Sequence, residues 1–377
     1  MSQTGSPVGS GAATGPPAGR DPDASPRSQE PSGARRIGGS LVGAIAPRAY
    51  LIVVLAIVVL VGTMSSEFFF TERNLLAVLV TASVIAVLAV GQFHVMVTGG
   101  IDLSVGSVVA LSSVVSALIL SRGSPLILAI VAALGVGALC GVVNGVLVVY
   151  GRVAAFIATL AMLSVARGLA YIIQQDRLIP ISDRTFLSIF SGRVAGIPAP
   201  VLIALLVMVL SAIVMSLTPA GRRLYAFGGN PEAARLSGLP VNRDVLMAYV
   251  TSATLASIAG LMLAAQLRQG SAITGTGYEL DSIAAAVVGG TALMGGTGDP
   301  VRAVLGALVI AAISNIMDIR GIAAEAQLIV QGGVIVLAVY VTSGSGTRAA
   351  RALVRRIRRG SGASRRQRAA TAAAEEG

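Results

Sequence analysis

The sequence contains no lysine and no tryptophan, and it has a single cysteine and a single histidine. Without lysine it lacks the phosphate-binding residue of a P-loop, so the chain cannot hydrolyse ATP in that way by itself. A lone cysteine excludes an intrachain disulfide, and one cysteine with one histidine excludes a Cys/His metal site. We therefore expect neither a metal nor another cofactor.

Charged residues are also scarce, at 12% of the chain, whereas hydrophobic residues make up 54% and the mean hydropathy is +0.82. A soluble chain of 377 residues needs more polar surface than this to cover its core. The 45 glycines suit helices that pack closely within a membrane. The composition predicts an all-α protein that crosses the membrane several times.

We expect ten apolar spans of about the length that a membrane helix needs. They cover residues 49–66, 75–97, 104–121, 126–149, 154–174, 199–217, 245–266, 280–295, 301–318 and 326–343. The eighth span, 280–295, is short and flanked by glycines, which makes it a candidate for a broken or re-entrant segment. Such a segment is tolerated only where protein buries it or where it lines a cavity.

The net charge of +11 is concentrated in three segments. Residues 1–48 carry +2, residues 218–244 carry +2 and residues 348–377 carry +7, so the rest of the chain is neutral. Basic segments stay on the cytoplasmic side, which predicts that both termini and the 218–244 loop are cytoplasmic. Ten spans give the same topology and place residues 175–198 outside. Because these arginines flank spans, we expect no nucleic-acid partner.

The composition divides the chain into three parts. Residues 1–47 are rich in Gly, Pro, Ser and Ala without an apolar period, which predicts a disordered cytoplasmic tail. Residues 48–343 form the transmembrane domain, and residues 344–377 form a basic cytoplasmic tail. In that tail, four arginines are expected to contact anionic membrane lipid: Arg351, Arg355, Arg358 and Arg359.

The 218–244 loop contains a helix signal of its own. Asn230 is a suitable N-cap, Pro231 suits the first turn, and Glu232 favours the positive end of the helix dipole. Gly238 is placed to end the helix. A short capped helix between two spans is either an ordinary loop helix or a docking element for a soluble partner.

Four ordered motifs resemble those of the ribose-type sugar permeases of binding-protein-dependent ABC importers. They are GGIDLSVGS at 99–107, FIATL at 156–160 followed by ARGLA at 166–170, GRRLYAFGGN at 221–230 continuing as EAARLSG at 232–238, and VGGTALMGG at 288–296. The resemblance covers roughly residues 48–343, and the four motifs together are highly specific. The tails and the segment 299–303 depart from the family pattern.

The resemblance implies a permease subunit in the inner or plasma membrane of a bacterium, which forms the path for a monosaccharide such as ribose, xylose or galactose. It implies four kinds of partner: cytoplasmic ATP-binding subunits, an extracytoplasmic sugar-binding protein, a second permease copy that is identical or closely related, and membrane lipid. The helix near residues 230–238 then docks in the ATPase. The residues that resemble this coupling element are Gly221, Arg222, Asn230, Glu232, Ala233 and Gly238.

Polar residues within or beside the spans are candidates for the sugar path, because sugars need hydrogen-bonding groups and few charges. They are Gln92, His94, Asp102, Ser104, Asn144 and Asn315. Each has a structural alternative. Asp102 or Ser104 can cap the third span, and the other side chains can bond between helices.

Several charged residues have two interpretations. Arg167 lies near the outer part of the fifth span and can snorkel to the surface. Glu279 and Asp281, which flank the start of the eighth span, are either caps or part of an outer gate. Three arginines of the external segment either meet acidic residues of a binding protein or belong to a solvated loop: Arg177, Arg184 and Arg193.

Three competing functions make different predictions. A branched-chain amino-acid permease of the same superfamily is the nearest alternative. The sequences of the four motifs and the scarcity of charged residues within the spans favour a sugar. An ion-coupled secondary transporter predicts acidic residues at mid-span and no docking helix, whereas the sequence indicates the reverse. A membrane-embedded enzyme needs a carboxylate cluster, a nucleophile–base pair or a metal site, and none is apparent.

Overall fold

A computed structural model describes residues 39–175 and 177–342, and thirteen helices make up almost all of their regular structure. Contacts separate residues up to Ile45 from a second unit, which begins at Ala46 and contains the helical bundle. Most of the predicted N-terminal tail and the whole C-terminal tail, with the arginines that were predicted to contact lipid, lie outside the described residues.

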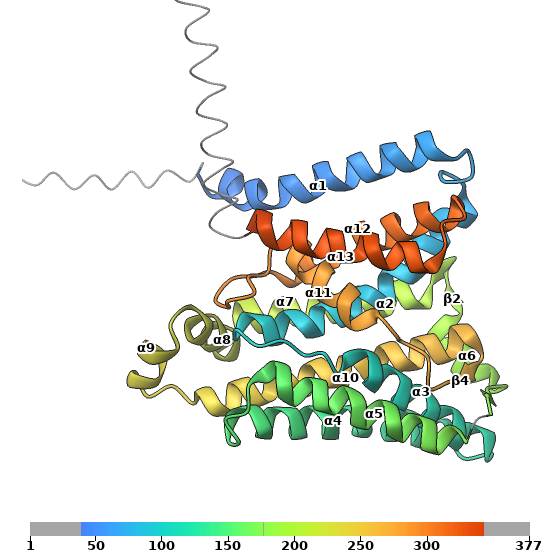
Figure 1. Cartoon of the computed structure of the whole chain (residues 1–377), viewed down its shortest axis with the longest axis horizontal. Coiled ribbons are helices and arrows are strands. Elements are labelled where there is room, and N and C mark those ends of the chain that lie inside the picture. Colours follow the sequence, from blue (N-terminus) through green and yellow to red (C-terminus); the bar gives the residue numbers. More distant parts are fainter. Residues whose placement is uncertain (1–38, 176, 343–377) are drawn as a thin grey trace, which may run out of the picture. The chain divides into compact units, whose positions relative to one another are not determined.

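Nine helices of the described ranges correspond to nine of the ten predicted spans, which confirms the all-helical membrane fold (Figure 1). Six are long and apolar enough to cross a membrane: α2 (Glu72–Val97), α4 (Leu126–Val149), α5 (Ala155–Gln174), α7 (Ala199–Leu217), α10 (Val241–Leu267) and α12 (Pro300–Ile319). Three have shorter apolar stretches: α1 (Gly39–Ser65), α3 (Val105–Ser121) and α13 (Ala324–Thr342).

The shorter elements lie at two opposite ends of the bundle. The α9 end carries α8 (Pro219–Gly229) and α9 (Pro231–Leu236), drawn at the left of Figure 1. The α6 end, at the right, carries α6 (Arg184–Ser191) and two antiparallel strand pairs. These pairs are β1 (Ile179–Pro180) with β4 (Gln269–Gly270) and β2 (Arg193–Val194) with β3 (Ile197–Pro198).

The eighth span is broken, as its flanking glycines indicate, and its helix does not cover the full range 280–295. The helix α11 covers only Tyr278–Val288, and Gly290 leaves it with φ +84°, which glycine adopts at little cost. Upstream, residues 271–277 form no helix or strand and run against α3. A Cβ on Gly275 would lie 2.8 Å from the carbonyl oxygen of Gly106. This crossing is therefore broken, one part non-helical and one part helical.

A second non-helical segment joins α2 to α3. Gly99 has φ +81°, and residues 100–104 then run through the protein interior, where Asp102 and Ser104 are fully buried. Surrounding protein must satisfy such backbone, because the hydrocarbon core of a membrane offers no hydrogen-bond partners. Both breaks lie beside α3 and bring polar groups into the bundle.

Small residues allow the close packing at the centre of the bundle. A Cβ on Gly141 of α4 would lie 2.6 Å from the carbonyl oxygen of Tyr249 on α10, and one on Gly145 would lie 3.0 Å from the Cα of Leu246. Glycine spaced by four residues on α4 thus lets two backbones approach. The helices α2 and α10 are buried along most of their length, whereas α4, α5 and α7 turn much of their surface outward.

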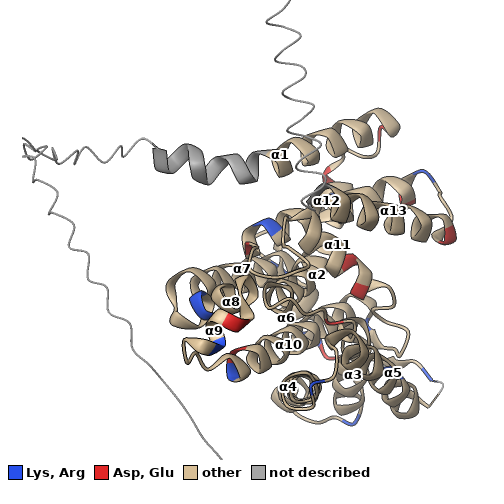
Figure 2. Cartoon of the chain, turned by 60° about the vertical axis from the view of Figure 1, so that its left-hand side comes forward, with Lys and Arg blue, Asp and Glu red and all other residues tan. Residues whose placement is uncertain are grey.

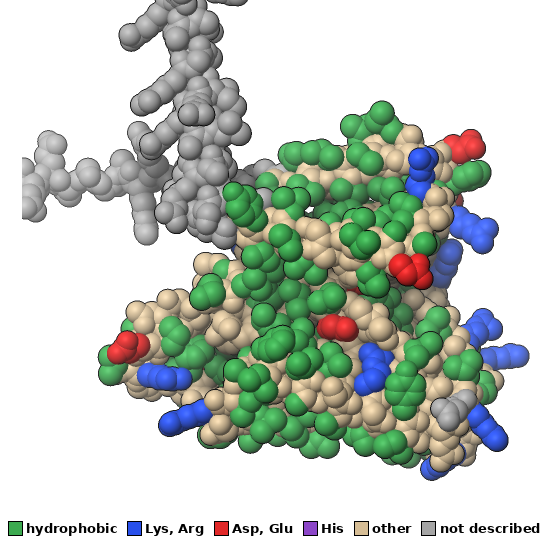
Figure 3. All heavy atoms as spheres, in the orientation of Figure 1, with side chains coloured by type: hydrophobic (Ala, Val, Ile, Leu, Met, Phe, Trp, Pro, Cys, Tyr) green, Lys and Arg blue, Asp and Glu red, His purple; other side chains and the backbone are tan. Residues whose placement is uncertain are grey.

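The outward surface of the helices is apolar. Figure 3 shows hydrophobic side chains spread over one face, with most of its charged side chains toward the two ends and a few in the middle. Figure 2 likewise shows charged residues mainly in loops and at helix ends. This distribution suits helices that are surrounded by lipid.

Candidate functional site

The helix predicted in the 218–244 loop is present as α9. Asn230 Oδ1 accepts a hydrogen bond from the Ala233 N–H at 3.0 Å, Pro231 opens the helix, and Gly238 follows it with φ +70°. Of its six residues only Ala234 is buried, and the large apolar side chain of Leu236 is 83% exposed. An outward-facing helix that exposes a leucine has a surface suited to a partner.

The preceding helix α8 is fastened to the bundle at several points. The Arg223 guanidinium donates to both carboxylate oxygens of Asp244 in the first turn of α10, at 2.6 and 2.9 Å. Tyr225 Oη donates to the Gly298 carbonyl at 3.0 Å, and burial raises the pKa of Tyr225 to about 12. Gly221 packs directly on the backbone of Met215 in α7, while Arg222 stays exposed.

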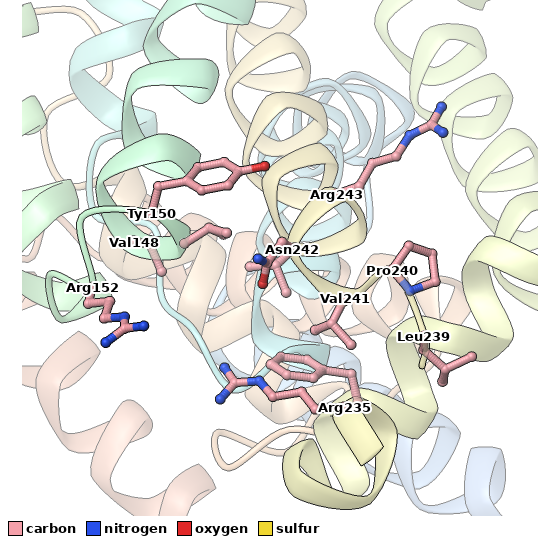
Figure 4. A pocket seen from close by; sticks show the side chains of 12 residues that line it. Val148, Tyr150, Arg152, Arg235, Leu239, Pro240, Val241, Asn242 and Arg243 are labelled. Atoms are coloured by element: carbon pink, nitrogen blue, oxygen red, sulfur yellow. The ribbon is translucent and has the colours of Figure 1, made fainter. Parts of the chain in front are cut away.

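A cavity of about 980 Å³ opens beside these elements (Figure 4). The end of α4, α8, α9 and the start of α10 line it. Its charged lining residues are Arg152, Arg235 and Arg243, with no acidic residue among them. Arg152 and Arg235 extend their guanidinium groups toward each other, whereas Arg243 points away from both. The cavity therefore presents positive charge at the α9 end.

Four of the six path candidates meet in one buried polar cluster. The Asp102 carboxylate accepts from the Ser104 N–H at 3.0 Å and from the Ser104 hydroxyl at 2.6 Å. Asn144 Nδ2 of α4 donates to Ser104 Oγ at 2.9 Å. With its amide oriented to satisfy both groups, Gln92 of α2 bonds the Asp102 N–H at 3.2 Å and the Asp102 carbonyl at 3.1 Å.

The cluster also contains residues that the sequence does not single out. Ser252 of α10 donates to the second carboxylate oxygen of Asp102 at 2.9 Å. Asn144 Oδ1 and Tyr249 Oη are buried without a hydrogen-bond partner in the described chain. Ser104 occupies the cap position of α3 and its side chain makes no capping bond, whereas Asp102 accepts a hydrogen bond from the Ser104 N–H at the start of the helix.

His94 and Asn315 lie apart from this cluster and bond between helices. His94 Nδ1 contacts the Val90 carbonyl at 2.8 Å, and Nε2 contacts Ser211 Oγ of α7 at 3.3 Å. The imidazole reaches a groove of about 580 Å³ lined mainly by apolar residues of α7 and α10. Asn315 of α12 exchanges two hydrogen bonds of 2.9 Å with Asn74 of α2.

The charged residues around the broken eighth crossing make contacts within the bundle. Arg167 does not snorkel, because its Nη1 donates to the carbonyls of Ala272 and Thr274, the latter at 3.0 Å. Glu279 and Asp281 lie in the first turn of α11, which starts beside the first turn of α3, and both residues are partly buried. Gln331 of α13 donates to Asp281. Acidic residues therefore do lie within the bundle.

The three arginines proposed to meet a binding protein are at the α6 end. Arg184 begins α6, Arg193 belongs to β2 and Arg177 lies in the preceding turn, and all three are exposed. This end also holds the contact of Arg320 with the Ser65 carbonyl. The structure thus places these arginines opposite α9.

The matching sequence family decides the class of this protein. Residues 74–339 match the model described as branched-chain amino acid transport system / permease component, which is well over half of the chain. The chain belongs to this permease family. It is a multi-pass membrane permease subunit and is not itself an ATPase.

Several similar proteins are named as sugar permeases. The ribose import permease protein of Escherichia coli (strain K12) is 41% identical over 295 residues, which cover 77% of this chain and 92% of the relative. The D-allose transport system permease protein of the same strain is 34% identical over 76% of this chain and 88% of the relative. The L-arabinose ABC transporter permease protein of Azospirillum brasilense is also 34% identical, over 76% and 85%. No solved structure matches the chain.

Proposed function

We propose that this permease subunit forms the transmembrane path of an ATP-driven monosaccharide importer. The observation that carries the proposal is the likeness to permeases named for ribose, allose and arabinose, which extends over about three quarters of this chain. The transmembrane domain 48–343 supplies the path. A second copy or close relative, two ATP-binding subunits and a sugar-binding protein complete the importer.

The α9 end is proposed to face the cytoplasm and to receive the ATPase. Positive charge favours the cytoplasmic side, and this end carries Arg235 and Arg243 beside the exposed α9. Glu232, Ala233 and Leu236 form the contact surface, and the arginine-lined cavity suits acidic groups of the partner. The α6 end then faces the sugar-binding protein with its exposed arginines.

Motion of α9 reaches the bundle through α8. The salt bridge from Arg223 to Asp244 connects α8 to α10, and the bond from Tyr225 to Gly298 connects it to the loop after α11. Asp102 on the α2–α3 break bonds Ser252 of the same α10. We propose that the Gln92, Asp102, Ser104 and Asn144 cluster holds this break beside the sugar path and shifts with α10.

Two alternatives have specific support. The family description names branched-chain amino acids, so an amino-acid substrate is the nearest competitor. Glu279, which lies inside the bundle, is the kind of residue on which an ion-coupled carrier relies. The exposed α9 favours an ATPase-driven importer over such a carrier.

Assembly and substrate are tested together in purified complexes. The chain is reconstituted with its ATPase and binding protein, and uptake of labelled ribose, allose, arabinose and leucine is compared. A Glu232→Arg, Gly238→Pro double variant is expected to form the membrane part but to lose bound ATPase. Glu72→Arg, an exposed change at the opposite end, is the matched control. Uptake of leucine in preference to every sugar contradicts the proposal.

A further inference from the structure

An arginine and a glutamate lie at mid-depth in the bundle, beside the non-helical segment 271–277. Arg167 is about 10 Å along α5 from its end at Gln174, and Glu279 adjoins Gly106, about 22 Å along α3 from its end at Ser121, at 1.5 Å per residue. Both distances fall within a hydrocarbon core of about 30 Å. Ionisable groups at such depth are costly and point to function.

The Oε2 atom of the Glu279 carboxylate is buried and has no hydrogen-bond partner among the described residues. Arg167 lies within electrostatic range of it, but no ion pair within 4.0 Å joins the two among the described side chains. Arg167 Nη1 is engaged by two backbone carbonyls, which hold the guanidinium in place. A fixed donor and an unpaired acceptor therefore share one region without neutralising each other directly.

Two buried hydroxyls of the same region are also unpartnered. Thr274 Oγ1, on the segment that Arg167 holds, is 6% exposed as a residue and bonds nothing in the described chain. Ser107 Oγ, next to Gly106 in the first turn of α3, is fully buried and likewise without a partner. Buried polar groups are normally satisfied, so these two hydroxyls are available to hydrogen-bond with a ligand.

The region is reached from the outer surface of the subunit. Ile273 is 65% exposed and Leu280 is 41% exposed, and Thr276 between them is exposed as well. The segment 271–277 therefore has one face against α3 and another face that is exposed.

We propose that Glu279 and Arg167 contact sugar hydroxyls in transit and form a weak mid-membrane binding site for a neutral polyhydroxyl ligand. The carboxylate accepts from hydroxyl groups, the guanidinium donates to hydroxyl oxygens, and Thr274 and Ser107 complete the set. Contacts of this kind replace the water that the sugar leaves behind. The inference rests on the proposed function and assigns residues to its path.

The test measures sugar molecules transported per ATP hydrolysed in the full reconstituted importer. Glu279→Gln, which keeps the side-chain shape, is expected to lower this ratio roughly ten-fold, as for the loss of a hydrogen bond to a charged group. The ATPase of this variant remains stimulated by sugar-loaded binding protein, and its thermal unfolding midpoint stays unchanged. Asp281→Asn, in the same helical turn but already bonded to Gln331, is the control with an unchanged ratio.

Failure of this inference is separable from failure of the proposed function. Absence of ATP-driven sugar uptake by the wild type contradicts the proposed function. Wild-type uptake together with an unchanged ratio for Glu279→Gln overturns only the site. The site is also overturned if uptake and sugar-stimulated ATPase activity fall by the same factor. Glu279 then serves assembly of the importer rather than sugar contact. Arg167→Lys keeps the positive charge but loses the planar, two-point donor geometry of the guanidinium. Its ratio of sugar transported per ATP is expected to lie between those of the wild type and Glu279→Gln.

Discussion

Arg223 on α8 donates two hydrogen bonds, of 2.6 and 2.9 Å, to the carboxylate of Asp244 in the first turn of α10. Asp244 is almost buried, with 9% of its side chain exposed, whereas 30% of the Arg223 side chain is exposed. A fork-to-carboxylate pair fixes orientation as well as distance. It therefore connects α8 firmly to the start of α10.

Breaking this salt bridge is expected to uncouple ATP hydrolysis from transport. Asp244→Asn should lower ATP-driven uptake roughly ten-fold, because the charged two-point contact is lost. Binding of the ATPase should remain, since α9 is untouched. Exchange of the two residues, Arg223→Asp with Asp244→Arg, should restore a large part of the uptake. Arg73→Gln, an exposed change at the other end, is the control, and equal uptake by Asp244→Asn and wild type contradicts the coupling role.

Adjacent glycines at the end of α8 are expected to respond differently to alanine. A Cβ on Gly228 would collide with the Val97 carbonyl oxygen and the Gly296 nitrogen, whereas one on Gly229 meets nothing within 4 Å. Gly228→Ala should therefore destabilise the permease by about 1–3 kcal/mol through overpacking. Gly229→Ala should be close to neutral. Thermal unfolding in detergent measures both, and equal midpoints for the two variants contradict the close approach.

Asp102 is expected to be structurally required. Three donors converge on its carboxylate, from Ser104 and Ser252, and an asparagine there offers a single acceptor oxygen. Asp102→Asn should cost about 1–3 kcal/mol, because buried donors lose their acceptor. Ser252→Ala, which removes one donor, should cost less. Stability and uptake should fall together, and lost uptake at unchanged stability would instead indicate direct sugar contact by Asp102.

Asn74 and Asn315 are expected to act as one unit between α2 and α12. Each amide donates to the other at 2.9 Å, so either single change to leucine leaves one amide without its partner. Each single variant should lose about 1 kcal/mol, in line with polar contacts between membrane helices. The double variant should lose less than the sum of the two. Additive losses, or altered sugar preference in Asn315→Leu, would favour the path role considered for Asn315.

The apolar helices could be predicted from the sequence because length and hydropathy are enough to identify a span. The glycines beside the eighth span also indicate a break, but the bounds of its helical part could not be predicted, since hydropathy does not report backbone conformation. Residues 271–277 are held out of a helix by contact with α3, at Gly275 and Gly106, and by donors from Arg167 and an acceptor on Gln174. The α9 helix was predictable because its cap residues act locally.

Part of the candidate site could also be predicted from the residues themselves. Gln92, Asp102, Ser104 and Asn144 are unusual polar residues within or beside apolar stretches, so the sequence singles them out, and the structure joins them. Ser252 is one of many serines in the spans and carries no distinguishing signal. Arg167 was expected to snorkel, because the carbonyls that hold it become visible only once the segment 271–277 is known to be non-helical.

Labelled-ribose uptake into proteoliposomes that hold this chain, its ATPase and its binding protein is the decisive test of ATP-driven sugar import. ATP is supplied on the ATPase side, in the absence of any ion gradient and then with a proton or sodium gradient but no ATP. An ATP-driven importer takes up ribose only with ATP, binding protein and an intact α9, and shows no uptake with a gradient alone. Uptake that follows the ion gradient and persists without the ATPase contradicts the proposed function.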